Sequence, residues 1–292
     1  MLLNTGSTRP PRLRSDLNLG VYWDLPTWSK GYETDPDRRH HNVAAAGYEG
    51  VQADTITLAK AHGLGCTFPG RFDSPQEVDA KTALWVSQGY EAASVHVGSG
   101  LEDDATIDAY ALAILAAVRR HRFPLFVETH RATITQDMWR TVQLVTRHPD
   151  LRINADFSHW YTGQEMLYGD MEAKLAFLAP VFARVGFMHG RIGTSGCMQV
   201  RLDDPQVLPA IATFREMWVR SMLGFLGLAG PGDVLPFNPE LLPSCINYAR
   251  DVRGPDDEPR EECDRWEESL RLTALAKECW EEALRRHAAD RK

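Results

Sequence analysis

Four side chains in the second half of the chain have the chemistry of metal ligands. Three are the carboxylates Glu128, Asp156 and Glu240, and the fourth is the imidazole of His189. Such a set suits one hard to borderline divalent ion, such as Mn²⁺, Mg²⁺, Co²⁺ or Zn²⁺. A lone Glu, Asp or His is more often a solvated or hydrogen-bonded residue than a ligand. The metal hypothesis therefore depends on whether the fold brings these four residues together.

The elements that must position them alternate along the chain. Eight short apolar segments have strand character: 19–23, 50–53, 65–68, 93–97, 124–128, 151–156, 185–189 and 234–237. Helical patterns lie between them: 38–46, 55–63, 75–88, 103–121, 135–147, 165–182 and 205–228. This alternation favours parallel strands, and eight units in about 250 residues suit an α/β fold of the closed (β/α)8 (TIM) barrel type. The rival, an open doubly wound sheet, lacks its Gly-x-Gly-x-x-Gly signature after the first strand.

A barrel of this kind would gather the four candidate ligands. Glu128, Asp156 and His189 end the predicted fifth, sixth and seventh strands, and Glu240 follows the eighth strand by three residues. Functional residues of (β/α)8 barrels lie at the carboxyl ends of the strands. We therefore predict that these residues meet at the mouth of the barrel and bind one metal ion.

The C-terminal part reads as an addition to the barrel. We expect a single domain over residues 1–292, with the barrel at about 17–245 and a helical extension at about 258–290. The charged segment 251–262 is predicted to be an exposed loop, and 263–290 an amphipathic helix. That helix either packs on the outside of the barrel or forms a homodimer contact, and the sequence leaves both open.

Composition narrows the class of protein. The formal net charge of −8 argues against a nucleic-acid surface, which needs clustered Lys and Arg. The sequence has no long apolar run of the kind that forms a membrane helix or a signal peptide. None of the five cysteines forms a C-x-x-C pair, which is typical of a reducing compartment. We expect a cytoplasmic protein that binds a small sugar or polyol and neither nucleic acid nor membrane.

Four short motifs carry a resemblance to a known family. They are VETHR (Val127 to Arg131), ADFSHW (Ala155 to Trp160), FMHGR (Phe187 to Arg191) and FNPEL (Phe237 to Leu241). Over roughly residues 17–245 the chain resembles the xylose isomerase-like barrel superfamily of sugar-phosphate isomerases and epimerases. In that family the Glu, Asp, His and Glu at these places bind the metal. The resemblance also implies that His159, three residues after Asp156, binds substrate or assists the metal.

The resemblance implies a reaction as well. Isomerases and epimerases of this family remove a proton from a carbon beside a carbonyl, while the metal stabilises the enediolate. By that resemblance Glu128 and Glu240 are the acid/base pair. Arg191 could hold an oxyanion or carboxylate. Further substrate contacts are expected from His96 and from two aromatic side chains on which a sugar face could pack, Trp23 and Trp160.

The sequence also departs from the family. Its DNA-repair members bind three zinc ions with an additional strand-three His and an Asp-x-His after the strand-seven His. Here the third strand ends without His, and the next His after His189 is His287, which counts against DNA repair. Gln52 stands where many sugar epimerases have a carboxylate. Three functions stay open: a sugar isomerase or epimerase, a lyase or dehydratase of a keto-sugar or keto-inositol with the same metal site, and a non-catalytic ligand-binding barrel.

Overall fold

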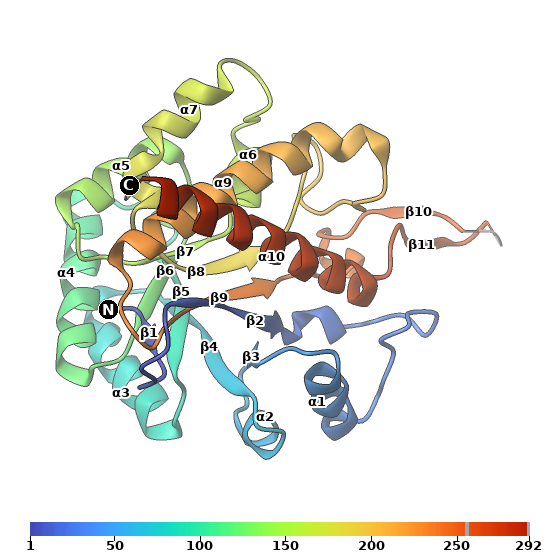
Figure 1. Ribbon diagram of the computed structural model, residues 1–292, viewed down its shortest axis with the longest axis horizontal. Coiled ribbons are helices and arrows are strands. Elements are labelled where there is room, and N and C mark those ends of the chain that lie inside the picture. The colour runs from blue at the N-terminus through green and yellow to red at the C-terminus, as the bar shows by residue number, and fades with distance from the viewer. Residues whose placement is uncertain (255–256, 291–292) are drawn as a thin grey trace.

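The computed structural model describes residues 1–254 and 257–290, and its centre is a closed barrel of eight parallel strands (Figure 1). The strands are β2 (Arg12–Asn18), β3 (Gly50–Gln52), β4 (Gly65–Phe72), β5 (Ala92–Val97), β6 (Leu125–Glu128), β7 (Ile153–Ala155), β8 (Val185–Gly190) and β9 (Asp233–Pro239). Each strand pairs with the next, and β9 pairs with both β8 and β2, which closes the barrel. The short strand β1 (Leu3–Asn4) pairs antiparallel with the start of β9. The predicted fold class is confirmed.

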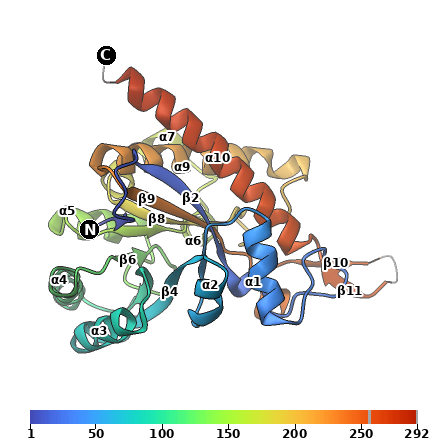
Figure 2. The same cartoon turned by 60° about the horizontal axis from the view of Figure 1, so that its bottom comes forward.

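Helices surround the strands. They are α1 (Pro36–Ala45), α2 (Thr57–Ala61), α3 (Val78–Gln88), α4 (Asp104–His121), α5 (Met138–Arg147), α6 (Ser158–Gly163), α7 (Met171–Phe177), α8 (Ala179–Phe182), α9 (Leu208–Leu228) and α10 (Arg265–Ala289). Figures 1 and 2 show α10 running along the outside of the barrel beside α9. Its apolar face, including Trp266, Leu272 and Trp280, is buried. The predicted extension therefore fills the place of the eighth barrel helix, and a homodimer stays a prediction.

The first barrel strand lies earlier than predicted. The expected strand 19–23 is wrong, because Leu19–Tyr22 form a 3₁₀ helix, η1, after the true strand β2. Asn18 turns the chain there, since its side-chain oxygen accepts a hydrogen bond from the Gly20 N–H at 2.8 Å. No apolar alternation marks β2, because Arg14, Asp16 and Asn18 share one face of the strand and are all buried. Arg14 and Asp16 form an ion pair of 2.6 Å, which compensates the buried charges.

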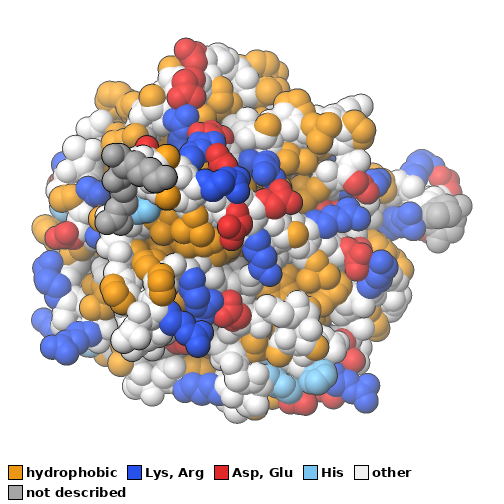
Figure 3. Space-filling model, in the orientation of Figure 1, with side chains coloured by type: hydrophobic (Ala, Val, Ile, Leu, Met, Phe, Trp, Pro, Cys, Tyr) orange, Lys and Arg blue, Asp and Glu red, His pale blue; other side chains and the backbone are white. Residues whose placement is uncertain are grey.

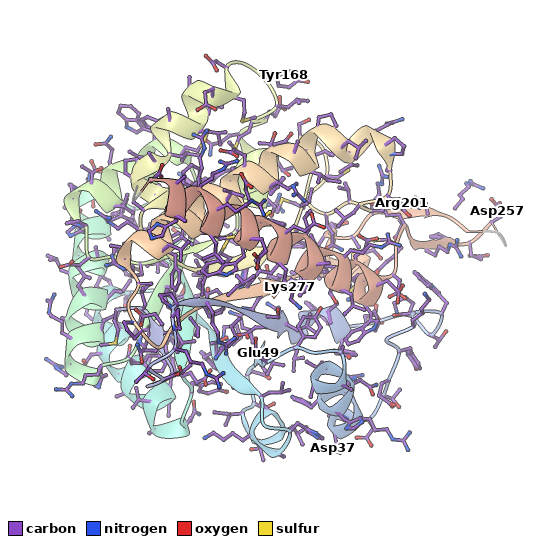
Figure 4. The ribbon with its side chains drawn as sticks, viewed as in Figure 1. Asp37, Glu49, Tyr168, Arg201, Asp257 and Lys277 are labelled. Carbon is purple, nitrogen blue, oxygen red and sulfur yellow. The ribbon has the colours of Figure 1, made fainter. Side chains whose placement is uncertain are left out.

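Other segments differ in detail. The predicted helix 165–182 is two short helices, α7 and α8, with a proline in the first turn of the second, and α6 was not predicted. The predicted loop 251–262 contains an antiparallel hairpin of β10 (Asp251–Arg253) and β11 (Pro259–Glu261). Both strands are short and mostly exposed, so no periodic pattern of apolar residues in the sequence predicts them. The hairpin projects from the barrel, with Asp257 near its outer end (Figures 1 and 4).

The barrel interior is layered. An apolar floor near the N-terminal ends of the strands consists of Leu3, Ala92, Phe126, Phe187 and Val234. Side chains two residues apart on a strand share a face. Glu128 and His189 therefore sit one layer above the floor and nearer to the mouth. Acidic and imidazole side chains therefore lie directly above a packed layer of apolar side chains.

The outer surface carries both signs of charge. On the face that includes α10, Lys and Arg side chains mix with Asp and Glu side chains rather than gathering by sign (Figure 3). Lys277 is exposed on the outer side of α10 (Figure 4). No helix in the described part of the chain combines the length and the apolar character that a membrane crossing requires.

Candidate metal centre

The four predicted ligands meet at the mouth of the barrel. Glu128 ends β6, Asp156 follows β7, His189 lies on β8 and Glu240 follows β9. Each offers one ligand atom, and the four atoms lie within 4.8 Å of one another. The two carboxylates Glu128 and Asp156 and the imidazole are buried, and Glu240 is partly exposed. A single ion could therefore contact all four.

The imidazole of His189 is oriented for coordination. Its Nε2 lies 2.8 Å from Gln52 Oε1, and that oxygen also accepts a hydrogen bond from the side-chain amide of Asn18. Because an amide oxygen can only accept, Nε2 carries a proton, and Nδ1 is the nitrogen left for a metal ion or a second proton. Nδ1 is buried, has no hydrogen-bond partner among the described residues, and lies 3.4 Å from Glu128 Oε2 and 3.5 Å from Glu240 Oε2. An unpartnered nitrogen between two carboxylates fits a metal ligand.

A proton and a metal ion compete for that nitrogen. Burial works to lower the pKa of His189, but the carboxylates of Glu240 and Glu128 outweigh it and raise the pKa to about 9. The same negative field that would hold a cation therefore holds a proton. Metal binding at neutral pH would release it.

Arg191 completes the charge balance of the centre. Its Nη2 contacts Asp156 Oδ2 and lies 2.7 Å from Glu240 Oε2, and its Nε donates to Ser158 Oγ at 3.0 Å. The side chain is fully buried, so the alternative of a surface arginine does not hold. With the His189 ring neutral, as it would be when it binds a metal, three carboxylates and one guanidinium sum to a formal charge of −2. A divalent cation would neutralise it, which is a second reason that the residues fit a metal.

Glu128 and Glu240 have different surroundings. Glu128 Oε1 lies 3.0 Å from His96 Nε2, and Oε2 accepts from Ser94 and Asn154 at 3.2 Å each. Burial works to raise the pKa of Glu128, yet the imidazoles of His96 and His189 lower it well below its ordinary value. Burial raises the pKa of Glu240 above its ordinary value, although the neighbouring cations oppose this. The two carboxylates thus differ in proton affinity, which is typical of acid/base pairs.

Three histidine rings form a row beside the centre. His130 lies between the other two, with ring centroids 4.2 Å from His96 and 3.9 Å from His159. His130 Nδ1 accepts a hydrogen bond from the Ala132 N–H at 3.1 Å. Its Nε2 therefore carries a proton. In this tautomer the Nε2 of His130 donates a hydrogen bond and does not coordinate a further metal ion. His159 is buried, its Nε2 lies 3.6 Å from Asp156 Oδ2, and neither ring nitrogen has a hydrogen-bond partner.

The other predicted substrate contacts, His96, Trp23 and Trp160, differ in whether they line a cavity. His96 lines a cavity of about 200 Å³ directly over the centre, together with Gln52, Arg71 and Pro69. Trp23 is 53% exposed and Trp160 is fully buried, with its indole N–H bonded to the Thr135 carbonyl. Neither indole lines this cavity or the larger one described next.

A second cavity of about 410 Å³ opens among the loops that follow β6, β8 and β9. Its lining includes Arg131, Thr162, Cys197, Tyr248 and Arg250. The Tyr248 ring lies 4.7 Å from the Arg191 guanidinium carbon and 6.5 Å from the His159 ring. Tyr248 therefore connects this cavity to the metal centre.

Two residues of the site, Asn18 and Tyr248, have no counterpart in the sequence prediction. Gln52 was noted in the sequence only as a departure. Asn18 and Gln52 end the neighbouring strands β2 and β3, so strand-end position is the signal that points to them. Tyr248 lies in a loop after the barrel, where no strand register predicts its position.

Comparisons with known proteins bear on the fold. No protein-family model and no curated protein matches the sequence. Among solved structures, the probable 3-DHS dehydratase AsbF from Bacillus anthracis is similar, with a TM-score of 0.52 and 12% identity, over 91% of this chain and 98% of that chain. An uncharacterised protein from Parabacteroides distasonis has a TM-score of 0.47 and 11% identity, over 92% and 98%. The first similarity agrees with the barrel fold.

Proposed function

We propose that this protein is a divalent-metal-dependent isomerase or epimerase of a sugar-like polyhydroxy carbonyl compound. One observation carries the proposal. Glu128 Oε2 and Glu240 Oε2 lie at nearly equal distances, 3.4 and 3.5 Å, from the unpartnered Nδ1 of His189. A substrate carbon held beside this centre would have a carboxylate within reach from two directions. Enolisation chemistry needs that arrangement, because one group removes a proton and another returns it.

The residues have separate parts in this mechanism. Glu128, Asp156, His189 and Glu240 would hold the ion, which when bound supplies a positive charge that stabilises an enediolate oxygen. Glu128 and Glu240 move the proton. Gln52 keeps the imidazole in place, and the side-chain amide of Asn18 donates to Glu240 Oε1 at 2.8 Å, which keeps that carboxylate in place. The cavity over the centre is small and lined by His96, which leaves room for a sugar-sized group and little water.

A dehydratase is the second candidate. The fold similarity to the probable 3-DHS dehydratase AsbF motivates it. The row of His96, His130 and His159 supports it independently, because elimination of water needs a proton donor for the leaving hydroxyl. Burial works to lower the pKa of His96, but the neighbouring Glu128 raises it above its ordinary value, so His96 is the ring of the row that can carry that proton. Both reactions begin with the same proton removal.

Deuterium exchange tests the proposal. The Mn²⁺-loaded protein is incubated in D₂O with a panel of ketohexoses and keto-inositols, and products are followed by NMR and mass spectrometry. We expect deuterium at a carbon beside the carbonyl with no loss of water. Glu128→Gln and Glu240→Gln should each lower the exchange rate by at least about 100-fold. A dehydrated product would favour the second candidate, and exchange that is unchanged in both variants would contradict the acid/base assignment.

A further inference from the structure

We propose that Arg131, Arg191 and Tyr248 form an anion-binding subsite beside the metal centre, and that it takes a carboxylate or phosphate of the substrate. The inference rests on the proposed function and deepens it, because it names the substrate class as anionic polyhydroxy compounds. Three features support it: the uncompensated charge of Arg131, an unpartnered nitrogen of Arg191, and the Tyr248 ring that both arginines approach.

Arg131 is a cation without a carboxylate partner. It lies three residues after Glu128, and it is exposed at the wall of the larger cavity. Within residues 1–254 and 257–290, no carboxylate lies within ion-pair distance of it and no group accepts a hydrogen bond from it. Its guanidinium lies over Tyr248, whose ring centroid is 5.8 Å from the guanidinium carbon. The whole fork of N–H donors is available to a ligand.

Arg191 approaches the same tyrosine from the metal centre. Its guanidinium carbon lies 4.7 Å from the ring centroid. Its Nη2 and Nε are occupied by Asp156, Glu240 and Ser158, but Nη1 is buried and has no acceptor in the described chain. A buried guanidinium nitrogen without an acceptor costs free energy. An oxygen of a bound anion would satisfy it.

The other charges of the larger cavity do not take the place of such an anion. Arg250 is already paired with Glu262, at 2.8 Å through its Nε. Asp251 is the carboxylate in the lining, and it forms no ion pair with Arg131. His159 adds two unpartnered ring nitrogens on the side of the metal centre. A guanidinium fork binds carboxylate and phosphate oxygens equally well in geometry, so the structure favours the anion class rather than one member.

In this proposal one molecule reaches from the metal centre past Tyr248 to Arg131. Its hydroxyl and carbonyl oxygens would occupy the cavity of about 200 Å³ over the metal centre, and its charged end the cavity of about 410 Å³. Tyr248 would pack against the carbon chain of the bound molecule, between its two ends. A neutral polyol would leave the donors of Arg131 without a partner, which is the basis of discrimination.

Three matched six-carbon polyols test the subsite. Calorimetric titrations of the Mn²⁺-loaded protein compare neutral sorbitol, the carboxylate gluconate and the phosphate sorbitol 6-phosphate, none of which can be turned over as a carbonyl substrate. We expect at least one charged polyol to bind about tenfold more tightly than sorbitol, which is the size of effect expected of a charge-assisted contact. The two charged compounds distinguish carboxylate from phosphate recognition.

Variants localise the effect. Arg131→Gln should bring the charged and neutral polyols to within about twofold of each other, whereas Arg119→Gln, which removes an equally exposed arginine on α4, should keep the preference. Equal binding of sorbitol and the charged polyols, or an unchanged preference in Arg131→Gln, would overturn the inference. Metal content measured in the same samples keeps the two proposals apart. A protein that takes up no metal under these conditions, yet still prefers the charged polyol through Arg131, would contradict the proposed function and support the subsite.

Discussion

At the scale of single residues, the imidazole of His189 owes its orientation to Gln52. The amide oxygen of Gln52 holds the proton on Nε2, so Nδ1 faces the carboxylates. Outer hydrogen bonds to a metal-binding His typically change metal affinity 10- to 100-fold. We predict that Gln52→Met, which removes the acceptor and keeps the length of the side chain, weakens Mn²⁺ binding by about tenfold in calorimetric titrations. Gln88→Met, on the exposed end of α3, is the control, and equal affinities in the two variants would refute this account of Gln52.

The charge state of His189 predicts a pH dependence of stability. Burial opposes the charged ring, but Glu240 and Glu128 raise its pKa to about 9, above the value of about 6.5 expected in the unfolded chain. A raised pKa contributes stability that is complete below pH 6.5 and is lost as pH rises through 9. EDTA-treated protein should therefore lose on the order of 3 kcal/mol of unfolding free energy between these pH values in urea denaturation. His189→Gln should lack this loss, and an equal loss in the variant would assign it to other groups.

Prediction from sequence worked best for residues at strand ends. Glu128 ends its strand, Asp156 follows its strand directly and His189 is the last residue but one of its strand, so the topology alone brings them together. Trp23 and Trp160 were proposed as sugar-binding aromatics from their position after strands, but local packing decides where a ring points. Trp160 anchors the inside of a loop, and Trp23 lies outside both cavities.

At the scale of elements, Arg265 joins the start of α10 to the mouth of the barrel. It is fully buried, pairs with Glu261 of β11 at 2.7 Å and donates to the carbonyls of Val21 and Asp24 after β2. Removing one partner of a buried pair leaves the other charge uncompensated. Arg265→Met should therefore lower the free energy of unfolding by about 3 kcal/mol in urea denaturation.

Two further variants separate this buried pair from ordinary surface charge. Arg253→Met breaks an exposed pair with Asp257, with side chains 79% and 75% exposed, and should cost less than about 0.5 kcal/mol. Adding Glu261→Gln to Arg265→Met should recover part of the loss, because it removes the unpaired charge. A loss in Arg265→Met no larger than that in Arg253→Met would contradict the anchoring role.

Elements were predictable where apolar periodicity is strong. The seven strands after β2 and the long helices α4 and α9 lie close to their predicted ranges. β2 was misplaced because its buried face is polar. Arg14 and Asp16 pair with each other, and Arg14 and Asn18 also bond to the distant Glu91 and Gln52. The β10–β11 hairpin is short and exposed, so it depends on pairing that the hydrophobic pattern does not record.

At the scale of the whole molecule, barrel closure makes the metal centre. Glu128, Asp156, His189 and Glu240 come from four consecutive strands, β6 to β9, and β9 closes against β2, which supplies Asn18. The apolar floor of Phe126 and Phe187 supports the acids from below, and α10 covers the outside of the closing strands. The polar layer costs folding free energy, because it concentrates three buried or partly buried carboxylates. A bound cation would offset that cost.

Metal content is the most direct test of this account. Protein purified without chelator and dialysed against metal-free buffer is measured by elemental analysis, alongside His189→Ala and the control His41→Ala, which removes an exposed imidazole. We predict one divalent ion per chain in the parent protein and in His41→Ala, and a large loss of metal in His189→Ala. An anomalous-scattering map of crystals should place the ion among Glu128, Asp156, His189 and Glu240. Full metal occupancy in His189→Ala, or a parent protein that binds no divalent ion when Mn²⁺, Mg²⁺, Co²⁺ or Zn²⁺ is supplied, would contradict the central claim.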